Sequence, residues 1–419
     1  MKRTVKDNRD LPHPKPVERV VLSEQKTRLR FALLILLILV AVGAFVYGIM
    51  QWLGKEDGWT TIEVNSAAEV NCGGEFIFQY YLGASGLSAA AENKLVSESY
   101  TDACVNAYQL FNSKEIGAIH NVGYINSHPN EEIEVDDALY RAFEICATYR
   151  NRNLYLGPAY ELYDSLFYCE DDWETVSFDP MQNEELKQFF TEVASYAVSP
   201  DKVDVQLLGN NRIMLYVSED YLKYAEEEYI SCFVDFYWMK NAFIADYIAD
   251  RMIANGYTKG SISSYDGFVR NFDSSDEISY SFNLYDRLEN YVYQAGCMEY
   301  TGQMSIVYLR NYPMNSLDFQ HYYELGDGSI RTPYLDTEDG VCKSALNNLV
   351  CYSKTAGCAE ILMEMIPVYI ADEFEEKLLP DTEDDNVYSI YFEGNELRFN
   401  EEALKLSGVD TNKVLAFFG

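Results

Sequence analysis

The segment from Tyr229 to Val269 constrains the fold most, because it joins two apolar runs through a helical repeat. Within it, Ile244, Ile248 and Met252 recur every fourth residue, which is the spacing of one helix face. Gly256 follows them, where a helix needs a residue that accepts a left-handed conformation. We therefore predict a buried strand, a helix that ends at Gly256, and a second strand. Such a crossover unit is typical of an α/β or α+β domain, and ligands meet the turns that leave its strands.

A second feature is the uncharged apolar run Phe31–Met50, which is about the length that crosses a hydrocarbon core of roughly 30 Å. Nine Lys and Arg against four Asp and Glu precede it, and this balance favours a cytoplasmic N-terminus. We predict a single-pass protein of the cell membrane with a basic cytoplasmic tail (1–30), a transmembrane anchor (31–53), a juxtamembrane linker (54–72) and an extracellular domain (73–419). A cleaved signal peptide is the alternative, but its apolar region usually has only about 7 to 15 residues.

The chain carries a net charge of −35, and because its first 30 residues are basic, the excess of acid lies in the predicted extracellular part. This charge excludes a nucleic-acid partner, since binding to a phosphate backbone needs the opposite sign. An anionic nucleotide would have to be held by local backbone amides or by a metal ion.

All nine cysteines follow the apolar run and form no CxxC motif, so neither zinc binding nor redox exchange is indicated. Cys146 and Cys232 lie in apolar contexts that are typical of packed thiols. Cys342 and Cys351 could close a small disulfide loop, although a disulfide framework is unusual in so long a chain.

The remaining chain mixes helical and strand patterns without an internal repeat or a Pro- and Gly-rich linker, which indicates one large α+β domain. Helices are predicted over Ser88–Phe111, Val135–Tyr149, Asn183–Ala197, Ala356–Met365 (before Pro367) and Tyr369–Lys377. Strands are predicted over Glu75–Gly83, Ile278–Leu284, Met304–Leu309, Leu317–Tyr323 and Ala345–Tyr352. Hairpins are predicted over Asp204–Ser218 and Val387–Phe399, with turns at Asn210-Asn211 and Gly394-Asn395.

In this order of elements, several motifs resemble those of the bacterial ApbE-type flavin transferases, which are FAD:protein FMN transferases. SKEIGAIHN, at Ser113–Asn121, is similar to the family's S-E-I-x-x-L-N turn with one extra residue. DFYWMKNAFIAD, at Asp235–Asp246, resembles D-L-G-G-I-A-K-G-Y-A-V-D, and a strand into SSYDG, at Ser263–Gly267, follows as in the family. The resemblance covers most of residues 73–376 and implies a flavin-transferase-like (ApbE/T-fold-like) α+β domain.

Further motifs carry the same resemblance. Tyr300-Thr301-Gly302 resembles the family's T-S-G turn, and His321 falls where the family has a paired His. Ala359–Glu364 occupies the place of the A-D-A-L-A-T helix start, whose Asp and Thr help to hold magnesium. The sequence also departs from the pattern. Tyr237-Trp238 stands at the family's Gly-Gly pair, Asn241 at its Lys, Tyr265-Asp266-Gly267 at its later Gly-Gly-Asp, Glu324–Gly328 at its D-P-x-T-G turn and Glu364 at its metal-binding Thr.

The resemblance implies Mg-dependent transfer of FMN from FAD to a Ser or Thr hydroxyl of a membrane or surface flavoprotein, with release of AMP. Phosphoryl transfer of this kind needs a cation between the phosphates and positioned donors. The resemblance assigns catalysis to Asp235, Lys240 and His321, and cofactor binding to Tyr237, Asn241, Ser263, Tyr265, Asp266 and Thr301. It assigns the metal to Glu360 and Glu364, which lie one helical turn apart.

These residues also have structural interpretations. A buried Asp235 could make a hydrogen bond within the protein, because a buried carboxylate without a partner is costly. Lys240 could cap a strand end, Asp266 could belong to a hairpin turn, and His321 could lie on a strand surface. The two glutamates could form a solvated face of an acidic protein. The aromatic side chains could stack on a flavin or fill the space that glycines leave open, and they are Phe236, Tyr237, Trp238 and Tyr265.

Two functions of different classes follow. In the first, the chain is an FMN transferase that uses FAD and magnesium. In the second, it is a non-catalytic binding or assembly module at the cell surface, without a cofactor. An unrelated extracellular α+β receptor is a third possibility. An open cavity between Asp235, Lys240, Asp266, His321 and Glu360 would favour the enzyme, and a filled one would favour the module.

Overall fold

The computed structural model describes residues 27–53, 57–65, 72–83, 85–116, 119–289, 291–314, 318, 321–380 and 386–418, except the side chains of 27–30, 47, 49–53, 72 and 73. The chain divides into two compact units, Met1–Glu56 and Asp57–Gly419. Most of the predicted tail (1–30) and much of the predicted linker (54–72) lie outside the described residues.

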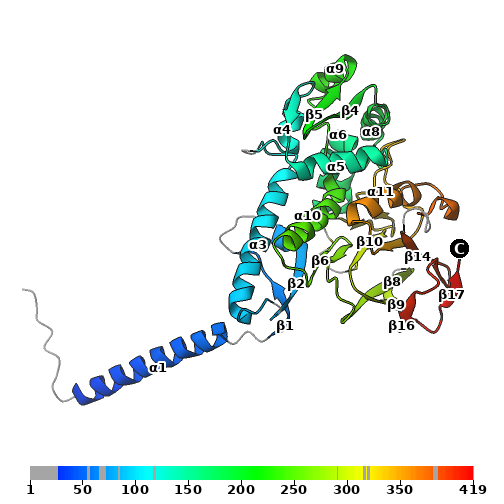
Figure 1. Cartoon of the computed structure of the whole chain (residues 1–419). Coiled ribbons are helices and arrows are strands. Elements are labelled where there is room, and N and C mark those ends of the chain that lie inside the picture. The colour runs from blue at the N-terminus through cyan, green and yellow to red at the C-terminus, as the bar shows by residue number, and fades with distance from the viewer. Residues whose placement is uncertain are drawn as a thin grey trace, which may run out of the picture. The chain divides into compact units, whose positions relative to one another are not determined.

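The first unit contains one long helix, α1 (Thr27–Leu53), which spans the predicted anchor (Figure 1). Its large apolar side chains between Phe31 and Val46 are exposed. Over the described part of the chain, no helix meets the length and apolarity that crossing a bilayer requires. Membrane anchoring therefore stays a prediction.

The second unit is built on a nine-stranded sheet in the order β1-β2-β6-β7-β10-β13-β14-β15-β17 (Figure 1). Its neighbours are antiparallel except β15 and β17, which are parallel. The strands are β1 (Gly58–Ile62), β2 (Phe76–Leu82), β6 (Gly260–Ser264), β7 (Phe268–Asn271), β10 (Met304–Arg310), β13 (Asn348–Ser353), β14 (Tyr388–Glu393), β15 (Glu396–Phe399) and β17 (Val414–Phe417). Every residue of β10 and β13 is buried, so the centre of this sheet is covered on both faces.

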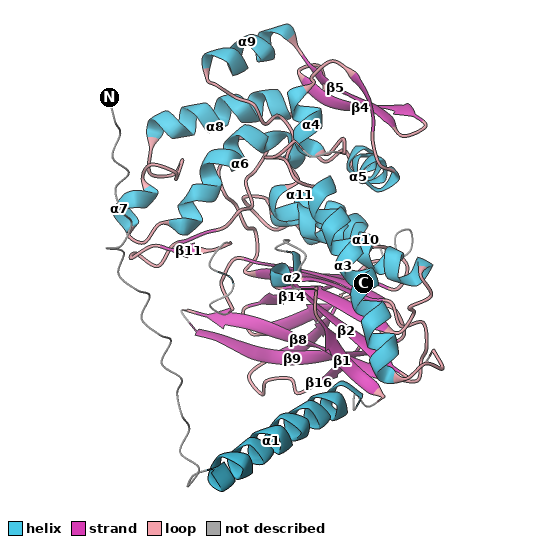
Figure 2. Cartoon of the chain, turned by 90° about the vertical axis from the view of Figure 1, so that its left-hand side faces the viewer, coloured by secondary structure: helices cyan, strands magenta, loops and turns pink. Residues whose placement is uncertain are grey.

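Helices cover one face of this sheet and a smaller sheet covers part of the other. Helices α3 (Ala89–Leu110), α10 (Lys240–Ala254) and α11 (Cys358–Tyr369) pack on the first face (Figure 2). The other face carries an antiparallel sheet in the order β16-β9-β8, made of β8 (Ser279–Leu288), β9 (Tyr291–Thr301) and β16 (Lys405–Ser407). A large apolar cluster fills the helical side and a smaller one lies under the small sheet.

The chain between α3 and α10 forms a further layer of helices with a three-stranded sheet in the order β3-β5-β4. Its elements are α4 (Val122–Ser127), β3 (Glu132–Glu134), α5 (Asp137–Thr148), α6 (Gly157–Tyr163), α7 (Asp172–Thr175), α8 (Glu184–Ala197), β4 (Val203–Gly209), β5 (Arg212–Val217) and α9 (Glu219–Glu227). Four of these helices begin at a polar side chain that accepts a first-turn amide, namely Asn121, Asp136, Asn183 and Ser218. The short elements elsewhere are α2 (Cys72–Glu75), β11 (Tyr323–Glu324) and β12 (Ile330–Arg331).

Most predicted elements are confirmed. Helices α3, α5 and α8 and the two predicted hairpins, β4–β5 and β14–β15, lie where the sequence patterns place them. Asn210 and Asn211 have φ values of 52° and 58°, as a two-residue hairpin turn requires. In the segment 229–269, α10 and β6 are confirmed, and Gly256 follows α10 with a φ of 86°.

The strand predicted before this helix is wrong. The backbone there is irregular because a side chain takes the place of a neighbouring strand. Asn126 Oδ1 accepts hydrogen bonds from the amides of Phe233 and Val234 at 3.0 and 2.9 Å, and its Nδ2 donates to Val234 O at 2.8 Å. The segment is therefore buried without being part of a sheet.

Two helix boundaries are also wrong. Helix α11 does not stop before Pro367 but continues to Tyr369. Because Pro367 lies in the last turn, its missing N–H removes a single bond near the end of the helix. The helix predicted over 369–377 is replaced by bends and a short 3-10 turn at Glu376–Leu378. Of the strand predicted over 317–323, residues 317, 319 and 320 lie outside the described part, and only Tyr323 is in a strand.

The eight cysteines whose side chains are described are all free. The disulfide considered between Cys342 and Cys351 is therefore not formed. Cys146 and Cys232 are buried, which confirms them as packed thiols.

Candidate functional site

A pocket of about 350 Å³ opens at the first turn of α10, and we call it the α10 pocket. It gathers residues from distant parts of the chain: Glu75, Tyr108, Phe111, Asn112, Ser113, Lys114, Asp164, Tyr168, Asp235, Tyr237, Trp238, Lys240, Asn241, Ile244, Asp266 and His321. Six of the predicted site residues therefore lie together, and they are Asp235, Tyr237, Lys240, Asn241, Asp266 and His321. A concave site with converging polar groups is the usual form of a ligand pocket.

Asp235 is buried in the pocket wall and is held by two hydrogen bonds. Its Oδ2 accepts from Ser113 Oγ and its Oδ1 from the Tyr237 amide, both at 2.8 Å. Burial raises the pKa of Asp235, while these bonds and the charges of Lys240 and Lys114 act in the opposite direction. The carboxyl group is thus fixed in position, and its proton is held more tightly than that of an exposed aspartate.

Lys240 supplies a positive charge at the start of α10. Its Nζ lies 3.6 Å from Glu75 Oε1, and its side chain is about one-third exposed. Burial disfavours the charge of Lys240, but Glu75, Asp235 and Asp266 raise its pKa above the ordinary value. The ammonium group therefore stays charged and available to a ligand at neutral pH.

Asn241 and Asp266 meet across the pocket and leave two acceptors unused. Asn241 Nδ2 donates to Asp266 Oδ2 at 2.9 Å. The other oxygen of each side chain, Oδ1, is buried and accepts no hydrogen bond from the described residues. Burial raises the pKa of Asp266, and nearby His321 opposes this shift. A buried acceptor without a donor costs about 1–3 kcal/mol, so a ligand with N–H or O–H groups would satisfy both oxygens.

Tyr237 closes part of the pocket in a strained backbone conformation. Its φ is +40°, in the left-handed region where a residue with a Cβ is unfavourable. Its ring stacks on Tyr160 with centroids 4.8 Å apart, and its hydroxyl donates to Asp164 Oδ1 at 3.0 Å. The neighbouring Trp238 is buried edge-on against Tyr334 at 4.9 Å. These contacts hold both rings in space that the family's glycines would leave open.

Three predicted cofactor residues lie elsewhere. Ser263 and Tyr265 line a second pocket of about 650 Å³, which borders β8 of the small sheet. Thr301 lies at the end of β9, where its hydroxyl donates to Asp276 Oδ1 at 3.3 Å. The structure therefore separates these residues from Asp235, although all were assigned to one flavin site.

The two predicted metal ligands lie on α11 and are engaged by protein donors. Glu360 Oε2 accepts from the Gly357 amide at 3.0 Å, and Glu364 Oε1 accepts from the Tyr149 hydroxyl at 3.0 Å. Glu360 borders a third pocket, of about 420 Å³, together with Asp246. Within the described ranges, no three His, Cys, Asp or Glu side chains converge as metal ligands do. As arranged, the glutamates do not fit a magnesium ion.

The structure also brings in residues that the site assignment omitted, namely Glu75, Ser113, Lys114 and Asp164. Ser113 was detectable, because it begins the segment 113–121 that resembles a family motif. Lys114 and Asp164 form an ion pair at 3.4 Å on the pocket rim, and no local pattern pointed to their meeting.

No protein-family model and no curated protein matches the sequence. Solved structures do match the fold. The ApbE protein of Thermotoga maritima has a TM-score of 0.53 and 12% identity over 85% of this chain and 98% of its own. The flavin transferase ApbE of Vibrio cholerae has a TM-score of 0.53 and 10% identity over 85% of this chain and 99% of its own. The chain therefore has the α+β fold of the ApbE flavin transferases, as the resemblance of its motifs implied.

Proposed function

We propose that this chain is a membrane-anchored surface protein that uses an ApbE fold to bind a small polar ligand in the α10 pocket and does not transfer a flavin nucleotide. The cavity between Asp235, Lys240, Asp266 and His321 is open, which by itself favours the enzyme. Glu360, a predicted metal ligand, lies outside it, at the third pocket. The observation that carries this proposal against transfer is Tyr237, which stands at the family's first glycine and is held there by Tyr160 and Asp164.

The size of the pocket supports a small ligand. Ligand cavities span roughly 300 to 1,000 Å³, and the α10 pocket, at about 350 Å³, is at the lower end. Tyr237 and Trp238 reduce the space, and displacing either ring would remove an aromatic contact as well as buried area. A complete FAD molecule, with its two ring systems and two phosphates, would therefore extend beyond the α10 pocket.

The polar groups indicate which ligand would bind. The unused acceptors Asn241 Oδ1 and Asp266 Oδ1 call for hydrogen-bond donors, such as an ammonium, amide or hydroxyl group. Lys240 calls for an acceptor or an anionic group on the same molecule. A small zwitterion or a polar metabolite that carries both kinds of group would match them together.

The predicted location agrees with this function. Helix α1 presents apolar side chains all along Phe31–Val46, and the part of the chain beyond it is strongly acidic. We propose that α1 anchors the chain in the cell membrane with its N-terminus in the cytoplasm, so that the α10 pocket is outside the cell.

The first test asks for flavin transfer directly. Purified full-length chain is incubated with FAD, magnesium and a flavoprotein acceptor, and AMP release and covalently bound flavin are measured. We expect neither product. AMP release that stops when Asp235 is replaced by Asn would overturn the proposal and support FMN transfer to a partner flavoprotein.

The second test asks for ligand binding. Small polar metabolites, including amino acids and amines, are screened for a rise in the melting temperature of the full-length chain. We expect a stabilising compound whose effect is lost in Lys240→Met. Lys202→Met is the matched control, because Lys202 is a surface lysine paired with Asp220 far from the pocket lining. A shift that survives in Lys240→Met would contradict binding in the α10 pocket.

A further inference from the structure

A groove of about 650 Å³ runs along strand β8 on the side of the large sheet away from the helices, and we call it the β8 groove. One wall is formed by the consecutive residues 278–283, at the start of β8. Side chains alternate between the two faces of a strand, so consecutive residues line a groove only when it follows the backbone edge. Ser261 and Ser263 of β6 contribute the opposite wall.

This edge of β8 is open. Among the described residues, β8 pairs only with β9, and the small sheet ends at β8. From Ile278 to Tyr285 the sequence ISYSFNLY contains no charge and no proline. Natural proteins usually protect an open edge with a charged residue, a proline or a bulge, because its free N–H and C=O groups can pair with another strand. Between Ile278 and Tyr285, the edge has neither a charged residue nor a proline to protect it.

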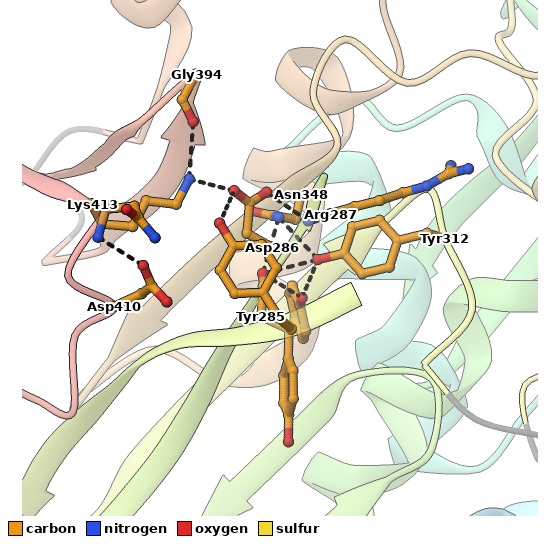
Figure 3. Close-up of polar contacts among 11 residues, drawn as sticks. Tyr285, Asp286, Arg287, Tyr312, Asn348, Gly394, Asp410 and Lys413 are labelled. Carbon is orange, nitrogen blue, oxygen red and sulfur yellow. Dashed lines mark hydrogen bonds and ion pairs between the residues drawn. The ribbon is translucent and has the colours of Figure 1, made fainter. Parts of the chain in front are cut away.

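Both ends of the open edge are anchored. At one end, Tyr280 meets the exposed ring of Trp59 edge-on, with centroids 5.8 Å apart. At the other, Tyr285 O accepts hydrogen bonds from Tyr312 Oη at 2.9 Å and from Asn348 Nδ2 at 3.1 Å (Figure 3). A register shift between Leu284 and Tyr285 turns this carbonyl out of the ladder. The edge is thus preorganised over roughly 17 Å, the rise of five residues in a strand.

The lining of the groove is almost uncharged, although the chain carries a net charge of −35. Arg310 is the one charged residue that lines the described groove. Its guanidinium is already engaged, because Nη2 donates to Asp318 Oδ1 at 2.9 Å and to Tyr265 O at 3.2 Å. A charged residue of a partner would lose its hydration there without gaining an opposite charge, so the groove favours an uncharged occupant.

We propose that the β8 groove binds an extended, uncharged segment of five to six residues from a partner protein, which adds to β8 as a further strand. Backbone hydrogen bonds to the edge supply affinity. Serine hydroxyls and the faces of Tyr280 and Phe282 receive alternate side chains of the partner. The surrounding acidity favours basic residues on either side of the bound segment. This inference does not depend on the α10 pocket.

The probe is a displayed library of random heptapeptides selected on the full-length chain. The strongest peptide is synthesised, and its dissociation constant is measured by fluorescence anisotropy. We expect N-methylation at alternate residues to weaken binding at least tenfold, and N-methylation at the intervening residues to have little effect. This alternation is specific to strand addition, since only every second N–H of an added strand faces β8.

Variants of the chain test the location. In Ser281→Lys/Asn283→Lys, two exposed edge residues become charged, and we expect at least tenfold weaker binding. Ser407→Lys, on β16 at the other edge of the same sheet, is the matched control and should bind normally. The proposal would be overturned if every selected peptide bound the double variant as tightly as it binds the unmodified chain. So would a neutral oligosaccharide or riboflavin that competes for the groove, or a dimer of the chain that the double variant dissociates.

Discussion

Asp246, in the middle of α10, accepts a hydrogen bond from the backbone amide of Ala359 at 2.8 Å and thereby caps a different helix, α11. A second bond, from the Cys358 amide, measures 2.9 Å. The cap residue of α11 is Gly357, which has no side chain of its own. A Cβ at Gly357 would lie 2.6 Å from Asp246 Oδ2, so the glycine makes room for the foreign carboxylate.

This arrangement predicts a pH dependence of stability. Burial raises the pKa of Asp246 to about 6, although Arg270 and the two amides oppose the shift. The folded chain therefore holds this proton more tightly than the unfolded chain, whose aspartates titrate near 3.9. The stability that this group contributes is complete below about pH 4 and is lost as the pH rises through 6. Relative to Asp246→Asn, the free energy of unfolding should fall by about 2 kcal/mol between pH 4 and pH 7.

Urea unfolding at several pH values measures the difference between the two proteins. Asp201→Asn, at an exposed turn before β4, is the control and should follow the unmodified chain. Parallel curves for Asp246→Asn and the unmodified chain would contradict the prediction.

The strained backbone at Tyr237 predicts an unusual order of variants. Tyr237→Ala and Tyr237→Gly both remove the ring and the hydrogen bond to Asp164. Only alanine keeps the penalty of a Cβ at a φ of +40°. The glycine variant should therefore be more stable than the alanine variant by about 1 kcal/mol. Chemical denaturation checks this order, and Glu192, exposed on α8, should show the reverse order because glycine weakens a helix.

The buried pair of Arg310 and Asp318 predicts a large loss that a second change restores. Their side chains are 2% and 0% exposed, so removing one partner leaves the other charge buried. Arg310→Met should destabilise the chain by about 3–5 kcal/mol. Arg310→Met/Asp318→Asn should recover most of this loss, because asparagine is neutral and still accepts the Met314 amide that now bonds Asp318 Oδ2. Denaturant unfolding measures both variants. If the double variant is no more stable than Arg310→Met, the uncompensated charge of Asp318 is not the cause of the destabilisation.

The contact of Lys413 with Asp286 predicts a local effect. Lys413 is 3% exposed, and its ammonium bridges Asp286 Oδ2 of β8 and Gly394 O, so it holds the β8–β9 hairpin against the segment after β14 (Figure 3). In Lys413→Met, the amides of β8 and β9 should exchange hydrogen faster while those of α10 remain protected. Lys405→Met, on the exposed side of β16, should leave both patterns unchanged. Equal acceleration in α10 would indicate global destabilisation instead.

The sequence predicted elements well where the signal was local. Asp136 and Asn183 mark helix starts, and Asn210-Asn211 marks a hairpin, because each acts on backbone within a few residues. The segment around Val234 misled the prediction, because its apolar side chains are buried as in a strand. Its amides bond Asn126, 108 residues away in the chain, and no local pattern encodes such a partner.

The same contrast between local signals and tertiary contacts holds for the residues of the candidate site. Asp235, Lys240 and Asn241 are near neighbours in sequence, so one motif placed them in one pocket. Tyr265 and Asp266 are adjacent but line different pockets, because they lie in the turn between β6 and β7 and not in a regular strand. The pairing of Glu75 with Lys240 depends on the tertiary fold alone.

The α10 pocket draws its lining from Glu75 at one extreme to His321 at the other, a span that includes most of the second unit. A partly folded form of that unit would therefore lack some of the residues that line the pocket. Occupancy is therefore coupled by mass action to the native state of the whole unit, and a ligand at 100 times its dissociation constant would add about 2.7 kcal/mol to the free energy of unfolding. A bound ligand would thus lower the unfolded fraction of the chain as well as occupy the pocket.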